Sequence, residues 1–273
     1  MKNFELSRFT RLLKLDVSRN RRQYLHEFLE MWLSFFAIQF VSYYTLFKGV
    51  YYTPVQIASA HENIYTAFLI VEFMFAMAFM ASSFSFLHDK NRRISYFMLP
   101  ATHLEKFVSR LIICTLGKFV LSLIAFVLAD LLVVGILRFF QNSLISVLPY
   151  AFDESIGFFT HGFDMMFDNG RPSYGGWVTI ASFLSSSCMT LSLYLLASMV
   201  FRKYPFILMS ICLITVTVVV SMLTLENING SFAFIVLRND GYMAILFTLL
   251  TCCFTGLSYW LFKRKGAVNQ TFL

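Results

Sequence analysis

Residues 111–137 read LIICTLGKFVLSLIAFVLADLLVVGIL, an apolar run interrupted by only two charged side chains, Lys118 and Asp130. A helix needs about 20 apolar residues to cross the hydrocarbon core of a bilayer, and this run is long enough to do so. Its apolar residues are continuous instead of alternating, which favours a helix over a strand of a membrane barrel. The run therefore predicts a transmembrane helix.

Five other stretches of the chain have the same character. The six predicted spans are 32–52, 65–87, 111–137, 177–201, 206–225 and 242–262. Hydrophobic residues make up 58% of the 273 residues and charged residues 14%, whereas a typical soluble domain is about 25% charged. We predict an all-α, polytopic membrane protein in which residues 32–273 form one six-helix transmembrane domain. The longest outer loop, 138–176, is too short to build a core of its own.

The positions of the basic residues predict the orientation of these spans. Seventeen of the 22 Lys and Arg residues lie in the N-terminal segment, the loop after the second span, the turn after the fourth span and the C-terminal tail. Only Lys48, Arg138, Arg171 and Arg238 fall on the opposite side. Cytoplasmic loops carry the excess of Lys and Arg, so both termini are predicted to lie in the cytoplasm and the chain in the cytoplasmic (inner) membrane. We attribute the net charge of +7 to topology and to contact with anionic membrane lipid, with no nucleic-acid partner.

The N-terminal segment, residues 1–31, has the pattern of an amphipathic helix outside the bilayer. Phe9, Leu12, Leu13 and Val17 fall on one helical face, and basic residues flank them. One interpretation is a helix that lies along the inner leaflet and leads into the first span. The alternative is a plain basic segment that only fixes the topology.

The cytoplasmic loop 88–110 contains an apolar run, Ile94–Leu99, that is too short to span a bilayer. Pro100 ends this run, and Thr102 and Glu105 have the spacing of a capping box, which predicts that the next helix begins here. An exposed apolar patch beside two arginines is typical of a docking site for a partner. The alternative is that the aromatic residues of the run dip into the inner interface of the membrane.

The sequence YFMLPATHLEKF, residues 96–107, resembles the LP-(A/V/S)-(S/T)-x-x-E-(K/Y)-(F/V) segment after the second span of ABC-2 type transporter permeases. The layout of a basic N-terminus, six spans and two cytoplasmic ends is similar to that family as well. The resemblance implies a permease subunit that exports an unidentified substrate by alternating access. It also implies a second permease protomer and a separate P-loop ATPase docked on this loop. The residues that it assigns to the ATPase contact are Arg92, Arg93, Tyr96, Phe97, Met98, Leu99, Pro100 and Glu105.

One feature departs from the family. Its better-known members carry their large external element between spans five and six, whereas here the long outer loop lies between spans three and four. A second hypothesis therefore stands beside the permease: a non-transporting membrane protein that acts as an assembly or sensory partner of other membrane subunits.

Signatures of catalysis are missing from the sequence. The only Gly-Lys pair, Gly117-Lys118, lacks the earlier glycine of a P-loop, and neither H-E-x-x-H nor G-x-S-x-G is present. The five His residues are scattered over both sides of the membrane. We expect no enzyme activity, no metal and no cofactor in this chain, and we expect ATP to be used by the partner subunit.

Three charged residues, Glu72, Lys118 and Asp130, fall inside predicted spans. Each costs at least about 2.5 kcal/mol at the bilayer centre, so each is expected to face protein or water. Antiparallel neighbouring spans bring Glu72 and Lys118 within reach of each other, whereas Asp130 lies about 18 Å further along the helix than Lys118, near the outer interface. Glu72 and Lys118 either line a translocation route or form a structural ion pair. A further alternative is that Lys118 reaches back to the inner interface.

Overall fold

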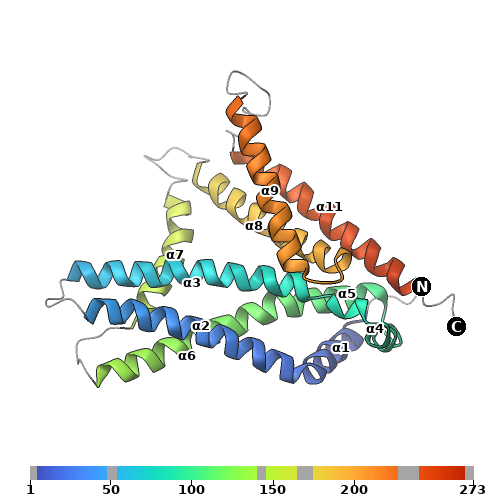
Figure 1. Ribbon diagram of the computed structural model, residues 1–273, viewed down its shortest axis with the longest axis horizontal. Coiled ribbons are helices and arrows are strands. Elements are labelled where there is room, and N and C mark those ends of the chain that lie inside the picture. The colour runs from blue at the N-terminus through green and yellow to red at the C-terminus, as the bar shows by residue number, and fades with distance from the viewer. Residues whose placement is uncertain (1–4, 48–53, 140–145, 165–174, 227–239, 268–273) are drawn as a thin grey trace. The chain divides into compact units, whose positions relative to one another are not determined.

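The computed structural model describes residues 5–47, 54–139, 146–164, 175–226 and 240–267, and over these residues it is helical and contains no strand (Figure 1). This agrees with the all-α prediction. The helices are α1 (Leu6–Arg19), α2 (Arg21–Phe47), α3 (Pro54–Ser82), η1 (Ser85–His88), α4 (Lys90–Phe97), α5 (His103–Ile112), η2 (Ile113–Gly117), α6 (Lys118–Arg138), α7 (Leu148–Asp164), α8 (Gly175–Val200), α9 (Pro205–Glu226) and α11 (Asp240–Ala267).

Four helical segments among the described residues are long and apolar enough to cross a membrane. They are Ile57–His88, His103–Arg138, Ile180–Val200 and Gly241–Gly266, and they cover the second, third, fourth and sixth predicted spans. The first predicted span begins within α2, and its last residues, 48–52, lie outside the described residues. In α9 the apolar helix Pro205–Val218 is shorter than the four. The total of six spans stays a prediction.

Two boundaries differ from those expected from the sequence. The predicted N-terminal segment 1–31 is divided between α1 and the first turns of α2, with Asn20 at the break. Hydropathy marks where a helix enters lipid, but backbone hydrogen bonding continues beyond that point, so α2 starts well before its apolar part. The first two residues of the predicted span 111–137 belong to α5, and the span contains one π-helical turn, η2. Such turns are frequent at functional sites, and this one ends immediately before Lys118.

Contacts group the chain into two compact units, although the sequence predicted one transmembrane domain. Unit 1 comprises Met1–Phe9, Met77–Leu111 and His161–Leu273, and unit 2 comprises Thr10–Ala76 and Ile112–Thr160. Each unit is therefore built from segments that lie far apart in the sequence.

In unit 1, α8 and α11 run side by side, and α8 also contacts α9. Near α4 and α5 this unit has an aromatic core around Phe262 of α11. The ring centroid of Phe262 lies 5.5 Å from that of Phe84, 5.8 Å from that of Phe107 and 5.1 Å from that of Phe97. This cluster attaches the short helix α4 to the much longer α11.

In unit 2, α2 packs along α6. Residues four apart on α2 form its buried face, which includes Met31, Phe35 and Gln39. Phe35 contacts Phe68 of α3 and Phe126 of α6, and the three rings lie 4.3–5.7 Å apart between centroids. These rings form an aromatic layer across the middle of the three helices.

Candidate functional site

The predicted docking loop folds as the helix α4 followed by a break and then α5. Asp89 caps α4, because its carboxylate accepts a hydrogen bond from the Asn91 backbone N–H at 3.0 Å. The same carboxylate lies 3.5 Å from Nε of Arg92. The helix begins four residues before the apolar run 94–99, since the cap sets its start and hydropathy does not.

The predicted capping box at the start of α5 is confirmed. The Thr102 hydroxyl accepts from the Glu105 N–H at 3.2 Å, and Glu105 Oε2 accepts from the Thr102 N–H at 2.8 Å. These reciprocal bonds satisfy two N–H groups that the helix itself leaves unpaired. The start of α5 is therefore determined by local sequence.

The second carboxylate oxygen of Glu105 binds the beginning of the chain. Oε1 accepts a hydrogen bond from the Glu5 N–H at 3.0 Å and another from Nη2 of Arg8 at 3.2 Å. Glu105 is fully buried. Its side chain links α1 to α5 inside unit 1, which removes Glu105 from the residues available to a partner.

Tyr96 is also buried, contrary to the expectation that it faces a partner. Its hydroxyl donates to the Lys106 carbonyl at 2.9 Å, and its ring packs against Phe86. Lys106 Nζ donates to the Phe97 carbonyl at 2.8 Å. In each of these two bonds one partner lies before Pro100 and the other lies after it. The bonds therefore connect α4 to α5 across the break.

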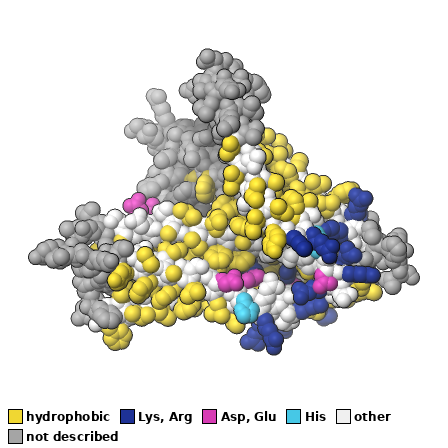
Figure 2. All heavy atoms as spheres, in the orientation of Figure 1, with side chains coloured by type: hydrophobic (Ala, Val, Ile, Leu, Met, Phe, Trp, Pro, Cys, Tyr) yellow, Lys and Arg dark blue, Asp and Glu magenta, His cyan; other side chains and the backbone are white. Residues whose placement is uncertain are grey.

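A smaller set of side chains reaches the surface of α4 and α5. Arg92, Met98, Pro100 and Leu104 are exposed, and Met98 is 64% exposed. We call these four residues the docking face. Arg93, Phe97 and Leu99 are half-buried. Figure 2 shows Lys and Arg side chains gathered beside this region, while hydrophobic side chains cover the long helices.

Leu104 was not predicted from the sequence. Glu105 and Lys106 point into the protein, so the preceding residue is left outside at 47% exposure. Its signal is an apolar residue in the first turn of a helix with a capping box, directly before the glutamate of the box, which faces inward.

Gly266 of α11 allows the half-buried Phe97 to pack closely. A Cβ atom at this position would lie 2.9 Å from the Phe97 ring and 3.0 Å from the His103 ring. We expect Gly266→Ala to lower the stability of the protein by about 1–2 kcal/mol through overpacking. Gly256→Ala, on the same helix, is the control, because its Cβ would meet nothing within 4 Å. Equal melting temperatures for the two variants would contradict this role of Gly266.

Lys118 has a partner that the sequence did not predict. Its ammonium group forms a buried ion pair with the Glu27 carboxylate of α2 and lies 4.5 Å from the centroid of the Tyr24 ring. Glu72, the expected partner, lies near Ser122 of α6 instead. Glu27 was missed because residues 1–31 were assigned to a separate N-terminal helix. In α2, however, Glu27 precedes Met31 by four residues and shares its buried face.

Asp130 is fully buried on the opposite side of the aromatic layer from Lys118. Its carboxylate accepts hydrogen bonds from the Ser146 hydroxyl and, at 3.4 Å, from the Val147 N–H. These bonds attach the residues just before α7 to α6. Gln39 is also fully buried, and its side-chain amide makes no hydrogen bond to the described residues. The interior of unit 2 therefore carries polar groups on both sides of the aromatic layer.

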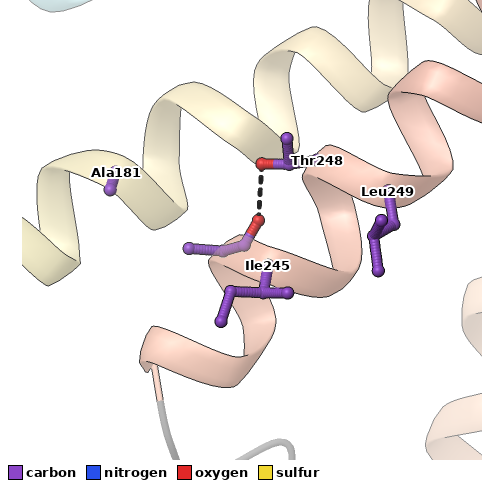
Figure 3. Close-up of a pocket in the computed structure, with 5 residues that line it drawn as sticks. Ala181, Ile245, Thr248 and Leu249 are labelled. Carbon is purple, nitrogen blue, oxygen red and sulfur yellow. Dashed lines mark hydrogen bonds between the residues drawn. The ribbon is translucent and has the colours of Figure 1, made fainter.

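A shallow pocket lies between α8 and α11 of unit 1 (Figure 3). Its volume is about 270 Å³, and its lining is Ala181, Ala244, Ile245, Thr248 and Leu249. The Thr248 hydroxyl donates to the Ala244 carbonyl at 2.7 Å, within its own helix. The lining therefore offers mainly apolar contact, which suits a hydrocarbon chain and not a polar substrate.

The described residues contain no group of three or more His, Cys, Asp or Glu side chains arranged to hold a metal ion. Comparison of the chain with protein-family models, with curated proteins and with solved structures gives no match.

Proposed function

We propose that this chain is the membrane-spanning permease subunit of an ABC-2 type transporter in the cytoplasmic (inner) membrane. In this proposal it has six spans, both termini in the cytoplasm and α1 along the inner leaflet. It exports a substrate by alternating access together with a second permease protomer. A separate P-loop ATPase supplies the energy. The motif at residues 96–107, the distribution of basic residues and the four long apolar helices support this proposal.

The docking face is the observation that carries the proposal. Met98 and Leu104 expose apolar side chains on the same short stretch of chain as the exposed Arg92. Tyr96 and Lys106 of that stretch are bonded within the chain. A contact that transmits motion from an ATPase must be rigid on the membrane side, because a flexible loop would absorb the displacement. The bonds of Glu105, Tyr96 and Lys106 supply this rigidity.

We expect Met98→Asp to weaken ATPase binding by about 30-fold, or about 2 kcal/mol, because it would bury an unpaired carboxylate in the interface. The amount of P-loop ATPase that co-purifies with the tagged chain, and the ATP hydrolysis of the eluted complex, measure the effect. Leu6→Asp is the matched control. Leu6 is 69% exposed, close to the value for Met98, but it lies on α1 outside the docking face.

Two outcomes would reject parts of the proposal. If the wild-type chain brings down no P-loop ATPase, the permease assignment fails and the assembly-partner hypothesis gains. If an ATPase co-purifies equally with wild type and with Met98→Asp, the ATPase docks elsewhere on the chain.

A further inference from the structure

The arginines of unit 1 differ in whether the chain supplies them with a carboxylate. Arg92 pairs with Asp89, and Arg8 pairs with both Glu5 and Glu105. Arg93 is adjacent to Arg92 in sequence, yet its Nε atom is buried and makes no hydrogen bond to the described residues.

Arg93 belongs to a group of positive charges from three parts of unit 1. His88, two residues before α4, and Lys265 of α11 both reach carbonyl groups at the end of α8. Arg202 follows that helix end by two residues, in the turn between α8 and α9, and Arg93 lies in the first turn of α4. The charges of Arg93, Arg202 and Lys265 all act on the His88 ring. Arg93 also acts on Lys265. We call Arg93, Arg202 and Lys265 the basic cluster.

The carbonyl groups at the end of α8 account for only part of the basic cluster. Lys265 Nζ donates to the Met199 carbonyl at 2.6 Å, and a ring nitrogen of His88 lies 3.2 Å from the Ser198 carbonyl. Cations are favourable at a helix C-terminus, where carbonyl groups lack partners. Among the described residues, Arg93 and Arg202 bond neither to a helix-end carbonyl nor to a carboxylate.

No carboxylate within the described part of unit 1 pairs with the basic cluster. The nearest acidic residue in sequence, Asp89, is already used by the Asn91 N–H and by Arg92. Like charges held together without a counter-charge repel one another, and an anion removes this cost.

The turn beside the basic cluster adds hydrogen-bond donors that carry partial positive charge. Tyr204 has φ 53°, a left-handed conformation that is uncommon for a residue other than glycine, and α9 begins at the next residue, Pro205. The first N–H groups of a helix are unpaired and carry partial positive charge. The turn thus places Arg202 three residues before this positive helix end, and strained conformations of this kind cluster at ligand sites.

We propose that the basic cluster binds a phosphate group, carried either by the headgroup of a membrane lipid or by a soluble phosphate. Arginine is suited to this role because its planar guanidinium donates two parallel hydrogen bonds to phosphate oxygens. The site lies on α4, the α8–α9 turn and α11, and it does not depend on the transport function.

The test uses the full chain purified in a neutral detergent. It is titrated separately with a short-chain phosphatidylglycerol, with the matching phosphatidylcholine and with inorganic phosphate, and the melting temperature is followed. We expect phosphatidylglycerol or inorganic phosphate to raise the melting temperature of the wild type in a saturable way. Arg202→Gln and Arg93→Gln are each expected to need about tenfold more of the probe, because a hydrogen bond to a charged group is lost. Lys263→Gln is the control, since Lys263 is exposed on α11 and acts on His103 but not on His88.

The probes separate the two sources of phosphate. Saturation by phosphatidylglycerol alone indicates a lipid headgroup, and an equal response to inorganic phosphate indicates a soluble ligand. The proposal is overturned if neither probe raises the melting temperature of the wild type, or if Lys263→Gln weakens the response as much as Arg202→Gln does. Arg202 lies on an exposed turn, so its variant remains informative even if Arg93→Gln folds poorly.

Discussion

Replacing Glu105 with alanine is expected to lower the stability of the protein by about 3 kcal/mol, because several hydrogen-bond donors lose a buried, charged acceptor. The Glu5 and Thr102 N–H groups lose their acceptor, and the Arg8 guanidinium loses one of its two carboxylates. The link between α1 and α5 is lost at the same time. Binding of the proposed ATPase should therefore weaken as well, although Glu105 itself is not on the docking face.

Thermal unfolding of the purified chain in detergent measures this change. A loss of about 3 kcal/mol corresponds to a fall of roughly 6–12 °C in melting temperature for a domain of 150–250 residues. Glu105→Gln keeps one oxygen acceptor, so its melting temperature should lie between those of Glu105→Ala and wild type. Glu30→Ala is the control for loss of a carboxylate, because Glu30 is exposed. Melting temperatures for Glu105→Ala and Glu30→Ala within a degree of each other would show that the Glu105 bonds contribute little.

The second large effect is expected at the Lys118–Glu27 ion pair of unit 2. The two side chains are only 5% and 14% exposed. Lys118→Met leaves the Glu27 carboxylate without its cation, with the Gln23 side-chain amide still donating to it, so we expect a loss of about 3 kcal/mol. Adding Glu27→Gln should restore much of that stability, with a coupling energy of about 2 kcal/mol between the two positions. A double-mutant cycle on the melting temperature or on chemical unfolding measures this coupling.

Glu72 provides the matched comparison for this cycle. Glu72 lies near Ser122 and Lys118 pairs with Glu27, so Glu72→Gln and Lys118→Met are expected to be additive within about 0.5 kcal/mol. A larger coupling of Lys118 to Glu72 than to Glu27 would contradict the pairing. Transport by Glu72→Gln, measured at wild-type abundance, also tests whether Glu72 lines a route for substrate, and normal transport would exclude that role.

The interior of unit 2 shows why intramembrane partners were difficult to predict. The sequence predicted that Glu72, Lys118 and Asp130 face protein or water, because a charge in hydrocarbon is costly. Which groups meet there depends on how α2, α3 and α6 rotate and shift against one another. The spans are apolar on all sides, so the hydrophobic pattern leaves that rotation open. The continuous α2 brings Glu27 to Lys118, and a boundary drawn by hydropathy at residue 32 concealed this.

In the loop 88–110, too, some features were predictable from local sequence and others depend on distant contacts. The capping box at Thr102 was predictable because its two residues lie within one helical turn of each other. The burial of Glu105 and Tyr96 was not, because it depends on Arg8, about a hundred residues away in sequence, and on Phe262 of α11. The family resemblance implied eight contact residues for a partner, and of these the structure leaves Arg92, Met98 and Pro100 exposed.

Local chemistry thus accounts for the helices, and long-range contacts account for the sites. Run length, hydropathy and capping residues act within a few turns of one helix, and they were sufficient to predict an all-α chain with helices long and apolar enough to span a membrane. Side-chain partners come from segments that are distant in sequence, so only packing decided that Lys118 meets Glu27 and that Glu105 receives Arg8. Packing likewise decided that α4, α11 and the end of α8 meet through His88 and Lys265, because no periodic pattern along the chain relates these segments.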